Sequence, residues 1–476
     1  MTLDDTIAAI ATPLGEGGLA VVRISGPQTL AVADKSFLPV GKNSLKPSAA
    51  TTHTIHYGKI VRQGRSVDEV LLAIMRAPHT FTREDTVEIT CHGGILPAKL
   101  VLDTLLENGA RLAEPGEFTR RAFLNGRIDL AQAEAVADLI HSRTELALAA
   151  ANEQLAGKLS QRINQLRDEM MQTLAHVEAH IDFPDEDISP DTKEQLLKRL
   201  EHGVTFMDKL LRTANEGQIL RRGIRAAIVG RPNVGKSSLL NQLLGHDRAI
   251  VSAIPGTTRD TIEETANIRG LPVVFIDTAG LREARDEIEQ EGVRRSHESL
   301  ARAEFVLHVL DASELLTPAD EKYFTDFAGK KRILVVNKVD LPRKLKLPAE
   351  CGRPRPQQFE NVANAAAGDG RTPVVDVCCL SGQGIEALKD AIKELVWSGE
   401  IKAEMLQVTI NSRHQDALTR ARAATQRTLD VLRAGETLEL AAGELRIAIN
   451  AIGEIVGKTA TEDLLDSIFS QFCIGK

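Results

Sequence analysis

The sequence predicts a multidomain protein of α/β and α class, with an N-terminal α+β domain, a helical domain, and an α/β domain inserted into the helical one. The first observation is length, because 476 residues are enough for about three domains. The second is composition, since 43% hydrophobic and 26% charged residues are typical of globular proteins. The third is a change in the hydrophobic pattern along the chain. β-like runs are followed by helical periodicity, then by apolar runs between polar loops, and finally by helix-like sequence again.

Residues 1–125 predict the small α+β domain. The runs LAVVRIS, EVLLAIM and TVEIT are β-like and are separated by Gly and Pro residues, which mark turns between strands. A single helical segment is expected after the motif CHGG.

The helical domain is predicted in two parts, at residues 126–220 and 396–476. Apolar residues at steps of three and four indicate one face of a long amphipathic helix, and they are Leu155, Leu159, Ile163, Leu166, Met170, Leu174, Val177 and Ile181. The run DFPDEDISPD interrupts this pattern with two prolines before a second helical stretch.

Residues 221–395 predict the inserted α/β domain. Four apolar runs, RAAIVG, VVFID, FVLHVLD and RILVVN, are each followed by a polar loop and a helix-like stretch, the pattern of buried parallel strands. Residues 341–375 read as a long solvated loop.

The run GRPNVGKS at 230–237 fits the phosphate-loop pattern GxxxxGK[ST] and follows an apolar strand. Backbone N–H groups of such a loop cradle phosphate, Lys236 reaches the β- and γ-phosphates, and Ser237 ligates Mg²⁺. Three further signals follow in order. PGTTRD offers Thr258 as a second Mg²⁺ ligand, DTAG places Asp277 near the metal and the Gly280 N–H near the γ-phosphate, and NKVD offers Asp340.

The Asp340 carboxylate is an acceptor for the N–H groups on the edge of guanine, so the four motifs together predict a Ras-like P-loop domain that binds GTP. The usual Ser-Ala-Lys loop beneath the base is replaced by Cys378-Cys379-Leu380, which lacks the Lys stem. The residues expected to contact GTP are Asn233, Val234, Gly235, Lys236, Ser237, Ser238, Ser252, Ala253, Ile254, Pro255, Gly256, Thr257, Thr258, Asp277, Thr278, Ala279, Gly280, Asn337, Lys338, Val339, Asp340, Cys378, Cys379 and Leu380.

Charge and cysteine content restrict the class of protein. The net charge of −8 argues against a surface coated for nucleic-acid binding, so an RNA contact needs a local basic patch or a partner. The 5 Cys residues form no CxxC spacing, which fits a reducing cytosol better than a disulfide framework or a zinc site. The N-terminus is acidic and the sequence contains no apolar run of about 18 residues. We therefore expect a cytoplasmic protein without a membrane span.

Beyond these motifs, the chain contains the runs DTIAAIATPLGEGGLAVVRISG, CHGG, PGEFTRRAFLNGRIDLAQAEAVADLI and the ending FCIGK. Together with the inserted GTPase, these runs resemble the family of the tRNA modification GTPase MnmE, also called TrmE, and the resemblance covers nearly the whole chain. It implies a homodimer formed through the N-terminal domain, and a tetrahydrofolate derivative bound there as one-carbon donor. It also implies a partner flavoprotein, MnmG (GidA), with which such proteins install a carboxymethylaminomethyl-type group on the wobble uridine of certain tRNAs.

The resemblance assigns roles to particular residues. Arg23, Glu88, Arg127 and Lys476 match folate-contacting positions, with Arg127 where other members can have Lys. Two guanidiniums and an ammonium suit the glutamate tail of folate, and a carboxylate suits the amine edge of the pterin. Cys473 matches the Cys of the family's terminal motif, and either a chemical role or a packing role is open for it. For His92 in CHGG, a hydrogen-bonded structural role is favoured over a catalytic base.

Potassium activation is also implied, because no Arg within these motifs plays the part of an arginine finger. The residues that resemble the family's monovalent-cation loop are Asn233, Ser252, Ile254 and Thr257. A K⁺ ion there offsets charge that develops on the phosphate. The competing interpretation is that Asn233 only stabilises the turn of the loop.

The attacking water needs a partner other than Leu281, which stands where many GTPases have a Gln but has no hydrogen-bonding group. The candidates in the acidic run downstream are Glu283, Asp286, Glu287 and Glu289. Family matching singles out Glu289 as the catalytic carboxylate, whereas the alternative is a solvated acidic face of a short helix.

Two classes of function remain open at this level. The favoured one is an enzyme, a GTP hydrolase whose cycle supports tRNA modification, with Lys236, Glu289 and Cys473 as catalytic candidates. The alternative is a regulatory GTPase switch in ribosome assembly. The folate-like N-terminal domain and the Cys-Ile-Gly-Lys tail favour the enzyme, because a pure switch needs neither.

Overall fold

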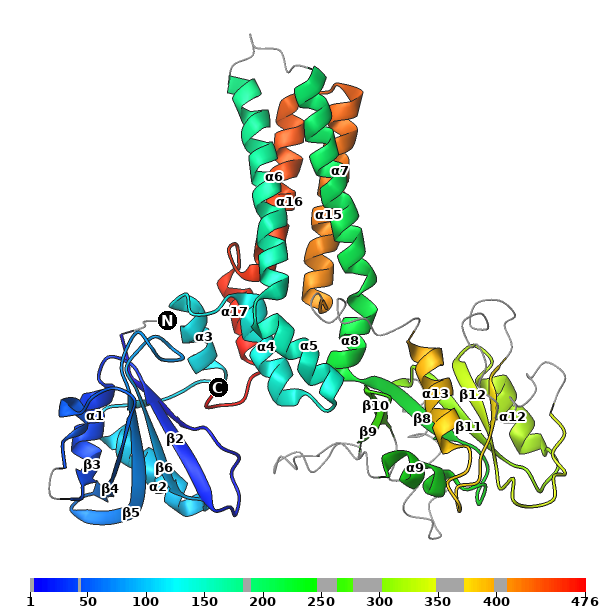
Figure 1. The fold of residues 1–476 in the computed structure, drawn as a ribbon, viewed down its shortest axis with the longest axis horizontal. Coiled ribbons are helices and arrows are strands. Elements are labelled where there is room, and N and C mark those ends of the chain that lie inside the picture. The colour runs from blue at the N-terminus through cyan, green and yellow to red at the C-terminus, as the bar shows by residue number, and fades with distance from the viewer. Residues whose placement is uncertain are drawn as a thin grey trace. The chain divides into compact units, whose positions relative to one another are not determined.

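The computed structural model describes residues 4–41, 44–182, 190–245, 263–276, 302–347, 372–397 and 409–476 (Figure 1). The chain forms two compact units, each assembled from segments that are distant in the sequence. Unit 1 consists of Met1–Ala137, Gln154–Met207 and Asp416–Lys476, and unit 2 of Asp138–Glu153 and Asp208–Gln415.

Unit 1 contains a seven-stranded sheet with the strand order β3-β4-β5-β6-β2-β1-β7. Its strands are β1 (Ile7–Ile10), β2 (Leu19–Ser25), β3 (Phe37–Pro39), β4 (Thr54–Arg62), β5 (Arg65–Met75), β6 (Thr86–His92) and β7 (Arg111–Leu112). Neighbouring strands are antiparallel except for β1 and β7. The three β-like runs predicted from the sequence lie in β2, β5 and β6, which confirms them.

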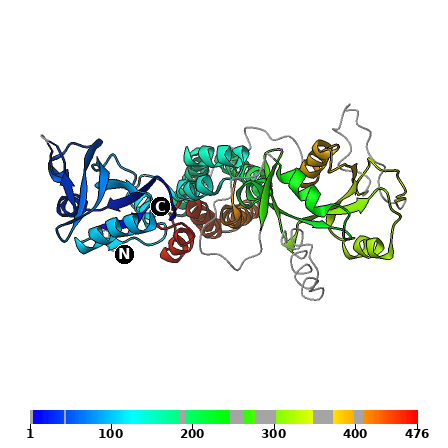
Figure 2. The same cartoon turned by 90° about the horizontal axis from the view of Figure 1, so that it is seen from below.

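The two faces of this sheet are covered differently, because successive side chains of a strand point to opposite faces. On one face Ala8 and Val22 pack in the main core with α1 (Thr29–Ser36) and with α2 (Ile95–Glu107), the helix expected after CHGG; Figure 2 shows α2 lying along the sheet. On the other face Ile7 and Ala9 pack against Phe118 of α3 (Glu117–Leu124).

The helical segments are α4 (Leu130–His141), α5 (Glu145–Leu155), α6 (Lys158–Asp182), α7 (Pro190–Arg212), α8 (Ala214–Arg222), α15 (Ser412–Ala434), α16 (Leu438–Val456) and α17 (Glu462–Phe469). The predicted long helix is wrong at its first residue, because Leu155 ends α5 and Gly157, at φ +82°, separates it from α6. From Leu159 onward the stripe is buried as predicted, except that Ile181 near the end of α6 is only half-buried. Helices α6 and α16 lie side by side (Figure 1), with an ion pair of 2.7 Å between Glu178 and Arg446. No described helix is both long and apolar enough to cross a lipid bilayer.

Unit 2 contains a six-stranded sheet with the order β13-β12-β11-β8-β10-β9. Its strands are β8 (Ile224–Val229), β9 (Glu264–Ile268), β10 (Leu271–Phe275), β11 (Phe305–Asp311), β12 (Lys331–Asn337) and β13 (Val374–Asp376), with helices α9 (Lys236–Leu244), α12 (Pro318–Asp326) and α13 (Ile385–Val396). The predicted runs form β8, β10, β11 and β12, which are joined in parallel, and only β9 runs antiparallel to its neighbour β10.

Helices α9 and α13 pack on one face of this sheet. The other face packs against Tyr323 within α12 and Phe327 just after it. The polar residues that follow β8, β11 and β12 therefore meet at one edge, since parallel strands end on the same side.

Candidate functional site

The phosphate loop joins the end of β8 to the start of α9, and two of its glycines are required by geometry. Gly230 has φ +145° and Gly235 φ +99°. A Cβ on Gly230 would lie 2.4 Å from the carbonyl oxygen of Val309, and one on Gly235 would lie 2.2 Å from Nδ2 of Asn337. The loop thus lies directly against the ends of β11 and β12.

The start of α9 is suited to an anion. Its first residue, Lys236, donates from Nζ to the carbonyl oxygens of Gly230 at 2.8 Å and Arg231 at 2.7 Å, and burial lowers the pKa of this ammonium. No side chain caps the N-terminus of the helix and its first turn has no acidic residue. The amides there and the ammonium are therefore arranged for phosphate oxygens.

Asn337 connects the phosphate loop to the loop beneath the expected base. Its side chain is 3% exposed. Nδ2 donates to the carbonyl oxygen of Val234 at 2.8 Å, and Oδ1 accepts from the backbone N–H of Cys379 at 3.1 Å. One buried amide thus holds three sequence motifs in a single arrangement.

The loop at 378–380 is held by a side-chain contact and a backbone contact. The thiol of Cys378 donates to Oδ1 of Asp340 at 3.2 Å, and the carbonyl oxygen of Cys379 accepts from Nε2 of Gln242 at 2.8 Å. Leu380 is 91% exposed. The exposed carboxylate of Asp340 is held in place as an acceptor, and Leu380 offers a short alkyl group where the usual Lys stem is missing.

Asp311, at the end of β11, is a site residue that the sequence analysis missed. Its carboxylate accepts from Nζ of Lys338 at 2.6 Å and from the hydroxyl of Ser313 at 2.7 Å. Burial raises the pKa of Asp311, but these hydrogen bonds outweigh it and the net pKa lies below its usual value. The pair fixes Lys338, the second residue of the NKVD loop, which has φ +63°. The available signal was a polar residue at the carboxyl end of the predicted strand FVLHVLD.

A second missed contact involves Arg231 of the phosphate loop. Arg231 donates from Nε to Asp320 at 2.9 Å, and its Nη2 lies 3.0 Å from Oε2 of Glu314. Asp320 is 1% exposed and also accepts from the backbone N–H and the hydroxyl of Thr317 at the start of α12. No local pattern pointed to this ion pair.

Part of the predicted site lies outside the described residues. These positions are Ser252, Ala253, Ile254, Pro255, Gly256, Thr257, Thr258, Asp277, Thr278, Ala279, Gly280, Leu281, Glu283, Asp286, Glu287 and Glu289. Of the described ones, Asn233 has φ +65°, Ser237 and Ser238 lie in the first turn of α9, and Val339 donates its N–H to the carbonyl oxygen of Val377 at 3.4 Å.

A second group of predicted residues meets in unit 1. Arg23 on β2 faces Glu88 on β6, with Nε 2.8 Å and Nη2 2.7 Å from Oε1. Nη1 of Arg23 donates to the carbonyl oxygen of Gly475 at 3.3 Å, so the C-terminal tail and its Lys476 lie beside this pair. Arg127 is exposed after α3 and forms no ion pair with a described residue.

Cys473 and His92 had alternative interpretations. The thiol of Cys473 is exposed, which contradicts the interpretation as a buried packing residue. His92 places Nδ1 2.7 Å from Oδ1 of Asp68 while its side chain is 71% exposed, so the expected hydrogen bond is confirmed.

Comparison with known proteins covers both groups of residues. Residues 130–473 match the model of the MnmE helical domain, and residues 6–127 match that of the GTP-binding protein TrmE N-terminus. The tRNA modification GTPase MnmE of Geobacillus kaustophilus is 49% identical over 479 residues, covering 100% of both chains. That of Listeria innocua is 47% identical over 473 residues, covering 99% of both. Among solved structures, Era of Aquifex aeolicus bound to GDP and AlF₄⁻ is 26% identical with a TM-score of 0.25, over 42% of this chain and 66% of that one.

Proposed function

This chain belongs to the family of the tRNA modification GTPase MnmE and is a GTPase of tRNA modification, and we propose the following activity, partner and cofactors for it. Hydrolysis of GTP is activated by K⁺. Together with the flavoprotein MnmG (GidA), the protein forms the carboxymethylaminomethyl-type group on the wobble uridine of certain tRNAs. A tetrahydrofolate derivative supplies the one-carbon unit, and the protein acts as a homodimer in the cytoplasm.

The observation that carries the nucleotide site is the buried Asn337, which bonds to both the phosphate loop and the base loop. With these loops in one arrangement, a nucleotide that places its phosphates at α9 presents its base to Asp340. Lys236 then exchanges its two backbone carbonyl contacts for phosphate oxygens, which offsets charge on the transferring group. The Asp340 carboxylate accepts from guanine N–H groups and selects GTP over ATP.

Two cations belong to this proposal, and oxygen donors suit both. Ser237 in the first turn of α9, with Thr258, would hold Mg²⁺, which prefers oxygen ligands. Asn233, with Ser252, Ile254 and Thr257, would hold K⁺ beside the phosphates. When bound, these ions neutralise charge on the phosphoryl group. If Na⁺ supports the same turnover as K⁺, or Asn233→Ala retains its response to K⁺, the potassium assignment is wrong.

Glu289 is proposed to orient the attacking water, since Leu281, the residue that follows DTAG, has no hydrogen-bonding group. A carboxylate accepts from water and aligns it with the γ-phosphate, a contribution made in the transition state rather than in ground-state binding. Glu289→Ala is expected to lower kcat by roughly 10²-fold with little change in GTP affinity. Glu283→Ala and Glu287→Ala are the matched controls. Hydrolysis by Glu289→Ala at the parental rate in saturating K⁺ would remove Glu289 from the mechanism.

The tetrahydrofolate site is proposed at Arg23, Glu88, Arg127 and Lys476. The support is the contact of Arg23 with both Glu88 and the backbone of Gly475, which brings the residue before Lys476 to the ion pair on the sheet. Such a set complements a ligand that carries carboxylates at one end and an amine edge at the other. Cys473 is exposed beside this group and is the candidate nucleophile of the tail.

The test is nucleoside analysis of tRNA from cells that lack this gene, complemented with the parental protein or with variants. The parental gene is expected to restore the modified wobble uridine, Lys236→Ala to fail, and Cys473→Ser to restore it only in part. Unchanged uridine modification in the deletion strain would overturn the proposed substrate and favour the alternative, a regulatory switch in ribosome assembly. Full restoration by Cys473→Ser would exclude a chemical role for its thiol.

A further inference from the structure

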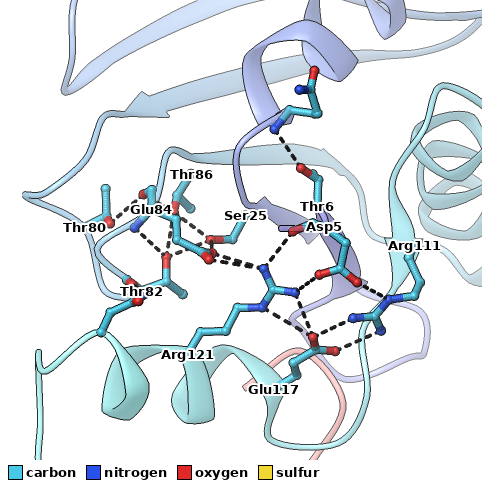
Figure 3. A network of polar contacts seen from close by, with 12 residues as sticks. Asp5, Thr6, Ser25, Thr80, Thr82, Glu84, Thr86, Arg111, Glu117 and Arg121 are labelled. Carbon is cyan, nitrogen blue, oxygen red and sulfur yellow. Dashed lines mark hydrogen bonds and ion pairs between the residues drawn. The ribbon is translucent and has the colours of Figure 1, made fainter. Parts of the chain in front are cut away.

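Arg121 on α3 is the largest fully buried side chain of the described chain, with 2% of it exposed. Its guanidinium pairs with three carboxylates from three segments, as Figure 3 shows. Nη2 lies 2.9 Å from Oε1 of Glu117 on the same helix and also bonds to Asp5 ahead of β1, and Nη1 lies 3.2 Å from Oε1 of Glu84 ahead of β6. One cation therefore ties α3 to two loops at the end of the sheet.

A second cation, Arg111, completes the cluster. It lies 2.7 Å from Glu117 and 2.8 Å from Asp5. Burial raises the pKa of Glu117, which is 1% exposed, but the hydrogen bonds from the two arginines bring the net value below its usual range. A movement of α3 against the sheet would separate these ion pairs and leave buried charges without partners. Because that is costly, the cluster restricts the position of α3.

The cluster lies beside Arg23 of the proposed folate site. Ser25 is two residues from Arg23 on β2, so both side chains lie on the same face of the sheet. The hydroxyl of Ser25 donates to Oε2 of Glu84 at 2.8 Å. Phe118 follows Glu117 on α3 and is fully buried, and the Arg23 guanidinium lies 5.6 Å from the centre of its ring. The cluster thus holds the helix that places the ring of Phe118 beside Arg23.

The same helix also meets the C-terminal tail at its first turn. Gly116, the N-cap of α3, has φ +67°, and a Cβ there would lie 2.6 Å from the carbonyl oxygen of Phe469. Its N–H donates to the carbonyl oxygen of Cys473 at 3.4 Å. One turn along, Arg120 pairs with Asp466 on α17 at 2.6 Å.

We propose that the cluster of Arg121, Glu117, Asp5, Glu84 and Arg111 is the positioning device of this site. It holds α3 so that Phe118 supports Arg23 and Gly116 receives the tail that ends in Lys476. The inference rests on the proposed function, and the ligand is of the tetrahydrofolate class. None of the five residues need touch the ligand; they act through Arg23 and the tail.

The experiment measures binding of 5-formyltetrahydrofolate to the full-length protein by calorimetry. Arg121→Lys keeps the charge but not the planar fork, and it is expected to weaken binding at least tenfold. Phe118→Leu leaves the ion cluster intact and is expected to weaken binding as well, so the proposal does not depend on one variant. The control is Arg62→Met, which removes an exposed ion pair with Glu107 in the same domain and should bind as the parent does. Parental affinity in both Arg121→Lys and Phe118→Leu overturns the proposal.

Hydrogen exchange, followed by mass spectrometry without ligand, separates this inference from the proposed function. Arg121→Lys should speed exchange in residues 111–125 and 470–476 but not in residues 54–75 of β4 and β5, whereas general unfolding would affect all three. If the parental protein binds no 5-formyltetrahydrofolate, the folate assignment fails, while localised exchange still supports positioning of the tail. Exchange at the parental rate in residues 470–476 counts against it.

Discussion

At the scale of single residues, the thiol of Cys378 takes part in the proposed recognition of guanine. It donates to the Asp340 carboxylate at 3.2 Å from a position that is 2% exposed. A thiol is a weak donor compared with a hydroxyl. The carboxylate is therefore held less firmly than a hydroxyl at the same position would hold it.

This contact predicts that Cys378→Ser binds GDP more tightly than the parent, and that Cys378→Ala binds it less tightly. One hydrogen bond to a charged group is worth roughly 1.5–3 kcal/mol, so the serine and alanine variants should differ by about tenfold or more in Kd. Titration with a fluorescent GDP analogue measures this. Equal affinities in the two variants would show that the group at position 378 does not position Asp340.

His308 on β11 is a buried group that the proposed mechanism does not use. It is 1% exposed, and neither ring nitrogen has a hydrogen-bond partner among the described residues. Its ring lies 5.6 Å from that of Tyr323 and 4.9 Å from that of Phe324. Burial lowers its pKa from 6.5 to about 4, with Asp320 opposing and Arg332 adding to the shift.

The lowered pKa predicts a loss of stability in mild acid. Between pH 6.5 and about 4 the unfolded chain binds a proton at this histidine and the folded chain does not, so the free energy of unfolding falls as the pH falls through this window. From pH 7 to pH 5 the loss is about 2 kcal/mol. The measurement is urea unfolding of the intact protein, with hydrogen exchange used to monitor unit 2. The free energy of unfolding of His308→Leu should not fall by this amount between pH 7 and pH 5. Parallel pH profiles for parent and variant would contradict it.

At the scale of elements, the start of α12 and the phosphate loop share one buried carboxylate. Asp320 accepts from the backbone of Thr317 and from Arg231, so it caps the helix and anchors the loop at the same time. A helix cap and an ion pair normally act locally; here the shared carboxylate couples them.

Arg231→Gln is therefore expected to affect both elements. The buried Asp320 loses its cation, which should cost roughly 1–3 kcal/mol of stability, and the loop that holds Lys236 loses a support, which should raise the Kd for GDP several-fold. Calorimetry and hydrogen exchange of residues 313–327 measure the two effects. Arg343→Gln is the control, because its ion pair with Asp376 is more exposed. An unchanged Kd would show that the loop keeps its shape without Arg231.

At the scale of the whole molecule, the two proposed sites lie in different units. A ligand stabilises the part of a protein that binds it by mass action. GDP with Mg²⁺ is expected to slow hydrogen exchange in residues 230–245 and 377–388, and 5-formyltetrahydrofolate in residues 19–25 and 470–476. Lys236→Ala should reduce only the protection by GDP, and Phe118→Leu only the protection by 5-formyltetrahydrofolate. Protection of residues 470–476 by GDP in the absence of folate would contradict this separation.

The sequence by itself determined the family, the parallel strands of unit 2 and the phosphate loop. Strand, glycine-rich loop and helix follow one another within a few residues, and a contiguous motif specifies local backbone geometry and chemistry together. The β-like runs and the stripe from Leu159 onward were also readable, because burial of one face imposes a period of two or of about 3.6 residues.

Only the tertiary structure decided how distant segments meet at the two proposed sites. Arg23 meets the backbone of Gly475 across 452 positions, Arg231 meets Asp320 across 89, and Arg121 gathers Asp5 and Glu84 from separate loops. Residues such as Asp311 and Arg121 read as ordinary polar residues in the sequence. Their role depends on low exposure and on partners far along the chain, and an ion pair between distant segments leaves no periodic or local signal.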